Sequence, residues 1–599
     1  MGAGASSTRS NLILRDHGVK TASAQALKRD GVGSGGAEAN GGGVRGKGVA
    51  EAAEAEPEVE TGAAAAAAVV ATAAQRVDSV SSEKLLNQWT ADAKLAKEKE
   101  VWKREGDYDA ILVGGGPAAV ASAMQMGFLG WRCAIIEGLP IVSAAPTGAI
   151  SKSLREAALA FYDAEGGVLP ATRAGRDRAW KTAMEVRTRM LGHAEDTADK
   201  QLREFHINVV RGWGRVVSAD GEVEVMTDDG QVGTLRAKRA VVVATGSKAA
   251  RRTKADFSQT RFIFDSDTIC ELDRLPKSMV VHGGSIVAVE FAQIFAKFGV
   301  HVTVLSRSQI LRDAFDGDLI QELMKSLSDM SNVQVRTGVN LTHVDVADEG
   351  NDPDDPDAGR VRCVVDGTGE VIEADTYLHA LGRVGNAPRG LADLGVSVSR
   401  NGMITVDKDT LYSGQGIIYA VGDVAAAGLV SLGLTQVDKL VAGLVGIAMD
   451  KLSFQPAAVW TIPDVAFVGV SEEKAKALHG AERVGSSVAR FRDTIKGAVK
   501  AYEVESGFLK LVFTKPEGVV IGVHICGTGS AEIISYGAIL VNHGLTLVDS
   551  TKMAFPAVTY HELYTKAAFT GILKLRGVRE SVRANIAWKH TRVDMLKEK

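Results

Sequence analysis

Residues near position 114 are spaced as in a binding site for a dinucleotide. The apolar run 108–113 is followed by Gly114, Gly116 and Ala119, the order of a strand, a turn and a helix. Gly114 permits a tight turn, Gly116 lets the backbone approach a pyrophosphate, and Ala119 lets the helix pack close to the strand. Glu137 ends the next apolar run, where a carboxylate suits ribose hydroxyls. These residues predict a first dinucleotide site.

A second unit of the same kind follows the apolar run 279–282. Gly283 begins its turn and Ala288 takes the third position, but Ser285 stands where the middle glycine is expected. The Ser285 side chain could crowd the pyrophosphate or donate a hydrogen bond to it, and the sequence leaves both alternatives open. This unit predicts a second, less regular dinucleotide site.

Two arginines indicate which dinucleotide the second site takes. Arg307 follows the next apolar run, Arg312 lies close behind, and no acidic residue occupies the ribose position. A guanidinium forks onto phosphate oxygens, so these arginines favour the 2′-phosphate of NADP(H). The alternative is that both are ordinary surface arginines.

The composition limits the class of protein that carries these sites. The 599 residues exceed one hydrophobic core, and domains of roughly 100 to 200 residues predict about three or four units. The net charge of -4 gives no electrostatic argument for nucleic acid. The chain has no run of about 18 large apolar residues, so we expect a soluble protein of the cytoplasm or an organelle matrix, the compartment being undecided.

The four cysteines do not form a local redox or metal motif. Cys133, Cys270, Cys363 and Cys526 are far apart and give no C-x-x-C or C-x4-C pair. Reduced thiols are the expected state. No metal site is predicted.

Short apolar runs alternate with helical stretches along the chain, which predicts an α/β fold with two Rossmann-like domains. An acidic stretch at 345–357 is expected to be a loop within a hairpin. The clearest buried strands are expected at 110–113, 134–136, 240–244, 279–281, 302–305 and 417–420.

Five motifs in order resemble the pyridine nucleotide-disulfide oxidoreductases, over about residues 107 to 575. They are GGGPAA at 114–119, VATGS at 243–247, the glycine turn at 283–288, LGRVGN at 381–386 and YAVGD at 419–423. The resemblance implies an FAD domain, an NAD(P) domain and a C-terminal α+β dimerisation domain that forms a homodimer.

The resemblance also assigns roles to individual residues. Gly422 and Asp423 would hold the ribitol and diphosphate side of FAD, and Thr245 and Gly246 would end the crossover beneath it. Gly382, in the fourth motif, is included among the cofactor-binding residues.

Two features of the thiol-dependent members of this family are missing. The segment 143–152 lacks their C-x4-C pair, and Ala557 replaces the histidine of their H-P-T-x-x-E motif, whereas Glu562 is kept. His561 is adjacent but turned about 100° on a helix, so we expect a surface histidine. A disulfide relay is therefore not expected.

Without these features the chain is most similar to the soluble pyridine nucleotide transhydrogenases, which use FAD to pass hydride between NADP(H) and NAD(H). By this resemblance Lys152 would lie near the flavin and pair with Glu290, where its charge would stabilise the reduced flavin. Ser285 and the altered segment 143–150 leave two alternatives. One is an NAD(P)H dehydrogenase with a quinone or another acceptor, and the other is a degenerate flavoprotein that acts as a binding or assembly subunit.

The N-terminal segment lies outside the resemblance. Its Gly, Ala, Ser and Glu content predicts a disordered or targeting segment, and its first residues match the pattern for N-myristoylation at Gly2, which would give weak membrane contact. The expected organisation is 1–80 disordered or targeting, 81–106 helical lead-in, 107–255 and 389–453 FAD-binding, 256–388 NAD(P)-binding, and 454–599 interface domain with a basic tail.

Overall fold

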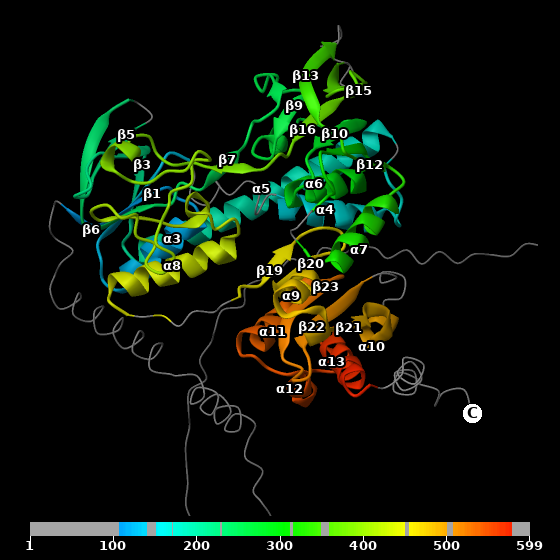
Figure 1. The fold of residues 1–599 in the computed structure, drawn as a ribbon. Coiled ribbons are helices and arrows are strands. Elements are labelled where there is room, and N and C mark those ends of the chain that lie inside the picture. The colour runs from blue at the N-terminus through cyan, green and yellow to red at the C-terminus, as the bar shows by residue number, and fades with distance from the viewer. Residues whose placement is uncertain are drawn as a thin grey trace, which may run out of the picture. The chain divides into compact units, whose positions relative to one another are not determined.

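A parallel sheet carries the first glycine turn (Figure 1). The strand order is β3-β2-β1-β6-β5-β4, and β18 pairs with β6 to make seven strands among the described residues. Strands β1, β2, β3 and β18 are parallel to the end of β6, whereas β4 and β5 form an antiparallel extension. The bounds are β1 Tyr108–Val113, β2 Cys133–Glu137, β3 Asn208–Arg211, β4 Trp213–Val216, β5 Glu222–Met226, β6 Val232–Val243 and β18 Ile418–Ala420.

The central strands of this sheet are buried on both faces, as continuous apolar runs in a parallel sheet predict. Leu112, Ile135 and Val242 lie in one core cluster, and Ile111 and Val241 in another. Helices α3 (Pro117–Phe128) and α8 (Val430–Leu444) pack against each other in the first of these cores.

The computed structural model describes residues 107–139, 151–170, 172–227, 230–311, 315–348, 359–447, 449, 454–499 and 507–577. All of them belong to one unit, Ala74–Lys599. The expected segments 1–80 and 81–106, the myristoylation pattern at Gly2, the altered segment 143–150, Arg312 and most of the basic tail lie outside the described residues.

A second parallel sheet carries the second glycine turn, with the order β12-β11-β10-β16-β9. Helices α6 (Ile286–Lys297) and α7 (Gly317–Ser328) share a core with this sheet. Its strands are β9 Ile263–Asp265, β10 Ser278–His282, β11 His301–Ser306, β12 Val333–Thr337 and β16 Thr376–His379.

Two small sheets accompany the second sheet. One has the order β15-β14-β13-β8, in which β13 and β14 form the hairpin expected around the acidic stretch, and the other pairs β17 with β7. Their strands are β7 Ser247–Ala249, β8 Lys254–Ala255, β13 Leu341–Asp348, β14 Arg360–Val365, β15 Val371–Ala374 and β17 Arg383–Gly385.

The C-terminal part is an antiparallel sheet of order β19-β20-β23-β22-β21, covered by α11 and α13. Its strands are β19 Ala457–Val459, β20 Val465–Gly469, β21 Val484–Arg490, β22 Phe508–Thr514 and β23 Val520–Cys526. Its helices are α9 Glu472–His479, α10 Ile495–Val499, α11 Ser530–Asn542, α12 Leu547–Lys552 and α13 Glu562–Leu575.

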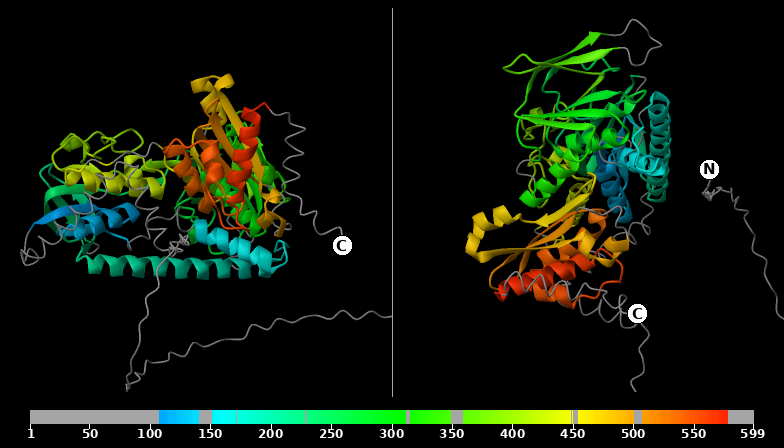
Figure 2. Two further views of the ribbon diagram at one scale, coloured as in Figure 1. Left: turned by 90° about the horizontal axis from the view of Figure 1, so that it is seen from below. Right: turned by 90° about the vertical axis from the view of Figure 1, so that its right-hand side faces the viewer.

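Helix α5 (Arg173–Glu204) is a long helix (Figure 2) whose side chains contribute to the cores of both parallel sheets. Near its start, Trp180 packs with Phe295 and Phe298 of the second core, and near its end Leu202 lies in the first core. Helix α4 (Ser151–Ala164) precedes it and contacts both α5 and α6. One long helix therefore packs against the cores of both sheets.

The α/β fold class is confirmed, and all six expected strands are present. Five have bounds within two residues of the prediction, whereas β6 begins at Val232, eight residues before the predicted start. The glycine turns follow β1 and β10, where the sequence places them. Among the described residues, none of the helices combines the length and apolarity required to cross a membrane.

Candidate functional site

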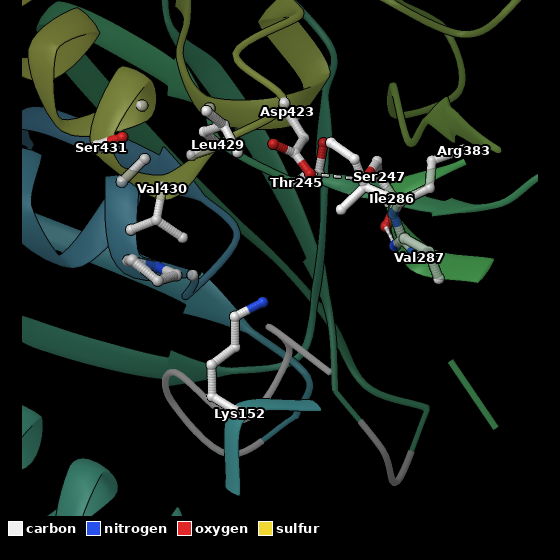
Figure 3. Close-up of a pocket in the computed structure, with 18 of the residues that line it drawn as sticks. Lys152, Thr245, Ser247, Ile286, Val287, Arg383, Asp423, Leu429, Val430 and Ser431 are labelled. Carbon is white, nitrogen blue, oxygen red and sulfur yellow. Dashed lines mark hydrogen bonds between the residues drawn. The ribbon is translucent and has the colours of Figure 1, made fainter. Parts of the chain in front are cut away.

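A cavity of ≈ 570 Å³ opens beside the first glycine turn (Figure 3). A cavity of this size is typical of a cofactor site. It is lined by the first turn, the end of β6, α4, α6, the 3-10 helix Gly422–Ala425, the start of α8 and the segment that ends in Trp460. Segments more than 300 residues apart therefore build one site.

The first glycine turn has the geometry that its sequence predicts. Gly114 has φ 108°, and a Cβ there would lie 2.5 Å from the carbonyl oxygen of Ala244, so only glycine fits. A Cβ on Gly116 would meet nothing within 4 Å, because this residue faces the open cavity. Ala119 is fully buried. Helix α3 starts at the cavity with no side-chain cap.

Glu137 lies at the cavity and also fixes the turn. Its Oε2 accepts a hydrogen bond from the Gly115 amide at 2.6 Å, and its Oε1 accepts one from Leu139 at 2.9 Å. The carboxylate is therefore held by two backbone donors at the end of β2, next to the space that we expect a ribose to fill.

Lys152 and Glu290 form an ion pair at the edge of this cavity. Lys152 Nζ lies 3.3 Å from Glu290 Oε2, and the lysine amino group points into the cavity (Figure 3). Glu290 is buried, whereas the Lys152 side chain is 28% exposed. Glu290 Oε1 also accepts a hydrogen bond from the Trp460 amide at 2.8 Å. The structure thus contains the pair that the family resemblance implies.

Asp423 is joined to the crossover through Ser247. The Ser247 hydroxyl donates to Asp423 Oδ2 at 2.7 Å (Figure 3), and Arg383 donates to the Ser247 hydroxyl at 2.8 Å and to Asp267 at 2.6 Å. Thr245 Oγ1 donates to the Asn386 carbonyl at 2.8 Å. The VATGS, GRVGN and GD motifs therefore form one hydrogen-bonded network.

The second glycine turn repeats the first one closely. Gly283 has φ 148°, and a Cβ there would lie 2.3 Å from the Ala380 carbonyl oxygen. Ser285 has φ -82° and ψ 172°, near the -72° and 175° of Gly116, so this position does not need glycine for its backbone. The Ser285 hydroxyl donates to the Ala380 carbonyl at 3.2 Å, and Ala288 is fully buried. The side chain bonds to the protein's own backbone.

Two further expected residues border the second turn. Arg307 follows β11 and is exposed, as a ligand for a phosphate group would be. Gly382 has φ 100° and is exposed, and a Cβ there would meet nothing within 4 Å.

The described cysteines do not line the cavity. Burial raises the pKa of all four, to about 12 for Cys270 and Cys363 and further for Cys133 and Cys526. Reactive thiolates are disfavoured at these positions.

His561 differs from the surface histidine that we expected. It is half-buried, its ring stacks on Phe555 with centroids 5.2 Å apart, and burial lowers its pKa. The stacking explains why its apolar face is covered.

Several residues of the site were not expected from the sequence, among them Ser247, Arg383 and Trp460, which line the cavity, and Arg155, which lies beside it. Ser247 and Arg383 lie inside the VATGS and LGRVGN motifs, and their position in these motifs could have indicated a role at the site. Arg155 and Trp460 form hydrogen bonds with residues that are hundreds of positions away in the sequence. A local sequence motif could therefore not identify them.

The cavity fits FAD. Helices α3 and α8 both begin at it without a side-chain cap, and Lys152 adds a cation, so orphan amides and positive charge can meet a pyrophosphate. Gly116 leaves room for close approach, and Leu429 and Val430 provide apolar surface for a ring system.

Two Rossmann-like sheets, two glycine turns and one cavity between them define an oxidoreductase that uses two dinucleotides. Residues 108–443 match the family described as pyridine nucleotide-disulphide oxidoreductase, and residues 455–568 match its dimerisation domain. The chain belongs to this family and is a flavoprotein oxidoreductase, with FAD and NAD(P)H as its cofactors.

Relatives with curated names cover most of the chain. A soluble pyridine nucleotide transhydrogenase of Mycobacterium bovis (strain BCG / Pasteur 1173P2) is 30% identical over 489 residues, 79% of this chain and 99% of the relative. A protein of the same name from Marinomonas sp. (strain MWYL1) is 30% identical over 485 residues, 78% and 98% of the two chains.

Solved structures show the same fold at lower sequence identity. LpdA from Mycobacterium tuberculosis has a TM-score of 0.67 and 21% identity, with 77% of this chain and 98% of that one covered. The HOCl-induced flavoprotein disulfide reductase RclA from Escherichia coli has a TM-score of 0.65 and 19% identity, with 77% and 99% covered.

Proposed function

We propose that this protein transfers hydride from NADPH to NAD through FAD and without a disulfide relay. The carrying observation is the Lys152–Glu290 pair at a cavity whose described lining includes no cysteine. The segment 143–150, which precedes Lys152, contains no cysteine either. Relatives named soluble pyridine nucleotide transhydrogenase at 30% identity support this proposal over a quinone acceptor.

Bound FAD would supply the redox chemistry, by taking hydride from one nicotinamide and giving it to another. The protein's own residues bind, orient and place charge. Lys152 puts a positive charge at the cavity and favours negative charge that develops there. Glu137 and Asp423 offer carboxylates for hydroxyl groups, and the start of α3 offers amides for phosphate.

For the second dinucleotide we propose the turn at Gly283 and Ser285, with Ala288 as the close-packing residue and Gly382 beside it. Arg307 is proposed to bind a 2′-phosphate, because it is exposed at the end of β11. Arg312 is proposed to assist it from outside the described residues. This assignment favours NADP(H) as one of the two nicotinamide dinucleotides.

The domain organisation is also a proposal. We assign 107–255 and 389–453 to FAD, 256–388 to NAD(P) and 454–599 to the interface. A homodimer is proposed from the match to the dimerisation domain. Its apolar exposed residues, which a twofold contact could bury, include Ile495, Val499, Met553 and Val558.

The test is the visible spectrum of the purified protein before and after anaerobic NADPH, followed by NAD. We expect a flavin spectrum that NADPH bleaches and NAD restores, with NADH formed. A flavin that NADPH cannot bleach would contradict the proposal, and bleaching that NAD does not reverse would point to another acceptor. Lys152→Met should slow bleaching by roughly tenfold or more, whereas Lys181→Met, an exposed lysine on α5, should not.

A further inference from the structure

The segment 460–464, which connects β19 to β20, is held between two helices that both reach the cavity. From α4, Lys152 and Arg155 are three residues apart, and from α6, Glu290 and Gln293 have the same spacing. Side chains at i and i+3 lie on the same face of a helix. Each helix therefore directs one residue to the ion pair and one to the segment.

Helix α6 binds one edge of this segment in the way that a neighbouring strand would. Glu290 Oε1 accepts a hydrogen bond from the Trp460 amide at 2.8 Å. Gln293 Oε1 accepts from the Ile462 amide at 2.8 Å, and Gln293 Nε2 donates to the Ile462 carbonyl at 2.7 Å. The backbone groups of Trp460 and Ile462 therefore both face α6.

Helix α4 binds the opposite edge. Arg155 Nε donates to the Thr461 carbonyl at 3.2 Å, and its guanidinium also pairs with the Asp464 carboxylate. Arg155 and Asp464 are both buried. The segment thus receives backbone hydrogen bonds from both helices, and its position relative to α6 is set by them.

Gln293, like Arg155, does not line the cavity, whereas Lys152 and Glu290 do. It is fully buried, and its carboxamide satisfies both polar groups of one peptide residue. Without it, the half-buried Ile462 amide and carbonyl would lose their partners, and the segment would shift to recover them. The Trp460 amide would then leave Glu290.

We infer that Gln293 is a positioning residue for the Lys152–Glu290 pair and acts by holding the segment Trp460–Ile462 against α6. The Trp460 amide takes up part of the negative charge of Glu290, and the rest is balanced by Lys152. When the amide leaves, Glu290 neutralises Lys152 more completely. Less positive charge then acts on the cavity, and reduction of a flavin there becomes less favourable.

The experiment compares full-length wild-type protein, Gln293→Leu and Ser326→Ala. Ser326 is the matched control, because its hydroxyl lies 3.2 Å from Gln293 Nε2 but does not contact the segment. FAD content, thermal stability and the flavin reduction equilibrium against a redox dye are measured on each. We expect Gln293→Leu to keep FAD and to shift the equilibrium about fivefold toward oxidised flavin, and Ser326→Ala to match the wild type.

Gln293→Glu keeps the side-chain size and keeps an acceptor for the Ile462 amide. Its second oxygen faces the Ile462 carbonyl, so we expect the same shift at neutral pH and recovery at acidic pH, where a protonated carboxyl can donate. An unchanged equilibrium in Gln293→Leu, with or without lower stability, overturns the inference. If that variant does not fold, an unchanged equilibrium in Gln293→Glu at neutral pH overturns it.

The inference rests on the proposed function, because its readout is the flavin in the cavity. The two fail differently. A wild-type protein with no flavin, or with a flavin that NADPH does not reduce, contradicts the proposed function. A wild-type flavin that is reduced normally, with variants that behave identically, contradicts only the role of Gln293.

Discussion

The Ser285 hydroxyl donates a hydrogen bond to the carbonyl oxygen of Ala380, 3.2 Å away. This contact links the start of α6 to the residue that follows strand β16, and it gives the hydroxyl a partner within the protein. The side chain is satisfied within the protein, so it does not need to bond to a pyrophosphate.

A Ser285→Gly substitution should therefore change nicotinamide dinucleotide affinity little. The backbone already has the conformation of Gly116, and only a small side chain that faces Ala380 is removed. We expect a Kd for NADP within about threefold of the wild type, since one neutral hydrogen bond contributes only modestly. Calorimetric titration of the FAD-bound protein measures this. A gain of tenfold or more would show that Ser285 obstructs the ligand.

Lys510 joins the C-terminal sheet to the start of α7, and its removal should destabilise the protein. Its ammonium lies 2.9 Å from Asp316, 2.7 Å from Asp318 and 2.8 Å from Glu472, and its side chain is only 2% exposed. Lys510→Met would leave the fully buried Asp316 without its cation, at a cost of about 3 to 5 kcal/mol. Urea unfolding measures this loss, and Lys474→Met, at an exposed position on α9, is the control that should stay near the wild type.

Three buried histidines predict a loss of stability in mild acid. Burial lowers the pKa of His282 to about 4, with His379 and Arg307 adding to the effect, and burial also lowers the pKa of His379 and His524. The unfolded chain, with an ordinary histidine pKa of 6.5, binds more protons than the folded protein below that pH. Stability is therefore fully present above pH 6.5 and falls as the pH drops toward 4, by up to about 1.4 kcal/mol per pH unit for one histidine.

The test of this pH dependence is the urea midpoint at pH 7 and pH 5. His282→Asn should be less stable than the wild type at pH 7, because the Tyr377 hydroxyl loses a partner 3.0 Å away, yet it should lose less on going to pH 5. His543→Asn replaces an exposed histidine and should show the full wild-type drop. An equal drop in His282→Asn and the wild type would assign the acid sensitivity elsewhere.

The sequence predicts the parts of this site that depend on local backbone geometry. Gly114 and Gly283 could be recognised because each backbone passes so close to a neighbouring carbonyl group that a Cβ would clash with it. This requirement fixes the residue type and the spacing. The six strands could be predicted from their apolar runs. A parallel strand that is covered on both faces must be apolar at nearly every position.

Residues that act across the fold were found only through the structure. Gln293 contacts Ile462 and Arg155 contacts Asp464, over separations of 169 and 309 positions. A buried glutamine on a mostly apolar helix looks like a minor exception in the sequence, because its partners in the segment are the backbone amide and carbonyl of Ile462. A hydrogen bond to a backbone atom does not require a particular residue type at the partner position, so it leaves no pattern in the sequence.

Arg383 provides the last prediction, which concerns retention of FAD. Its guanidinium holds the Ser247 hydroxyl and the Asp267 carboxylate, and Ser247 in turn donates to Asp423. In Arg383→Gln the Ser247 hydroxyl loses its donor partner and Asp267 loses its cation, so Asp423 is no longer held toward the cavity. Hydrogen bonds to charged groups contribute about 1.5 to 3 kcal/mol, so FAD should bind roughly 10- to 100-fold more weakly.

The FAD-to-protein ratio after extended dialysis measures this weakening, and Arg389→Gln, an exposed arginine six residues later, is the control that should retain FAD. Ser247→Ala should give a smaller loss than Arg383→Gln, because Arg383 also donates to the Ser247 carbonyl at 2.7 Å and keeps the crossover in place. If Arg383→Gln retained FAD fully while Ser247→Ala lost it, the orientation of Asp423 would depend on the hydroxyl alone and the arginine would serve only to brace β17 against β7.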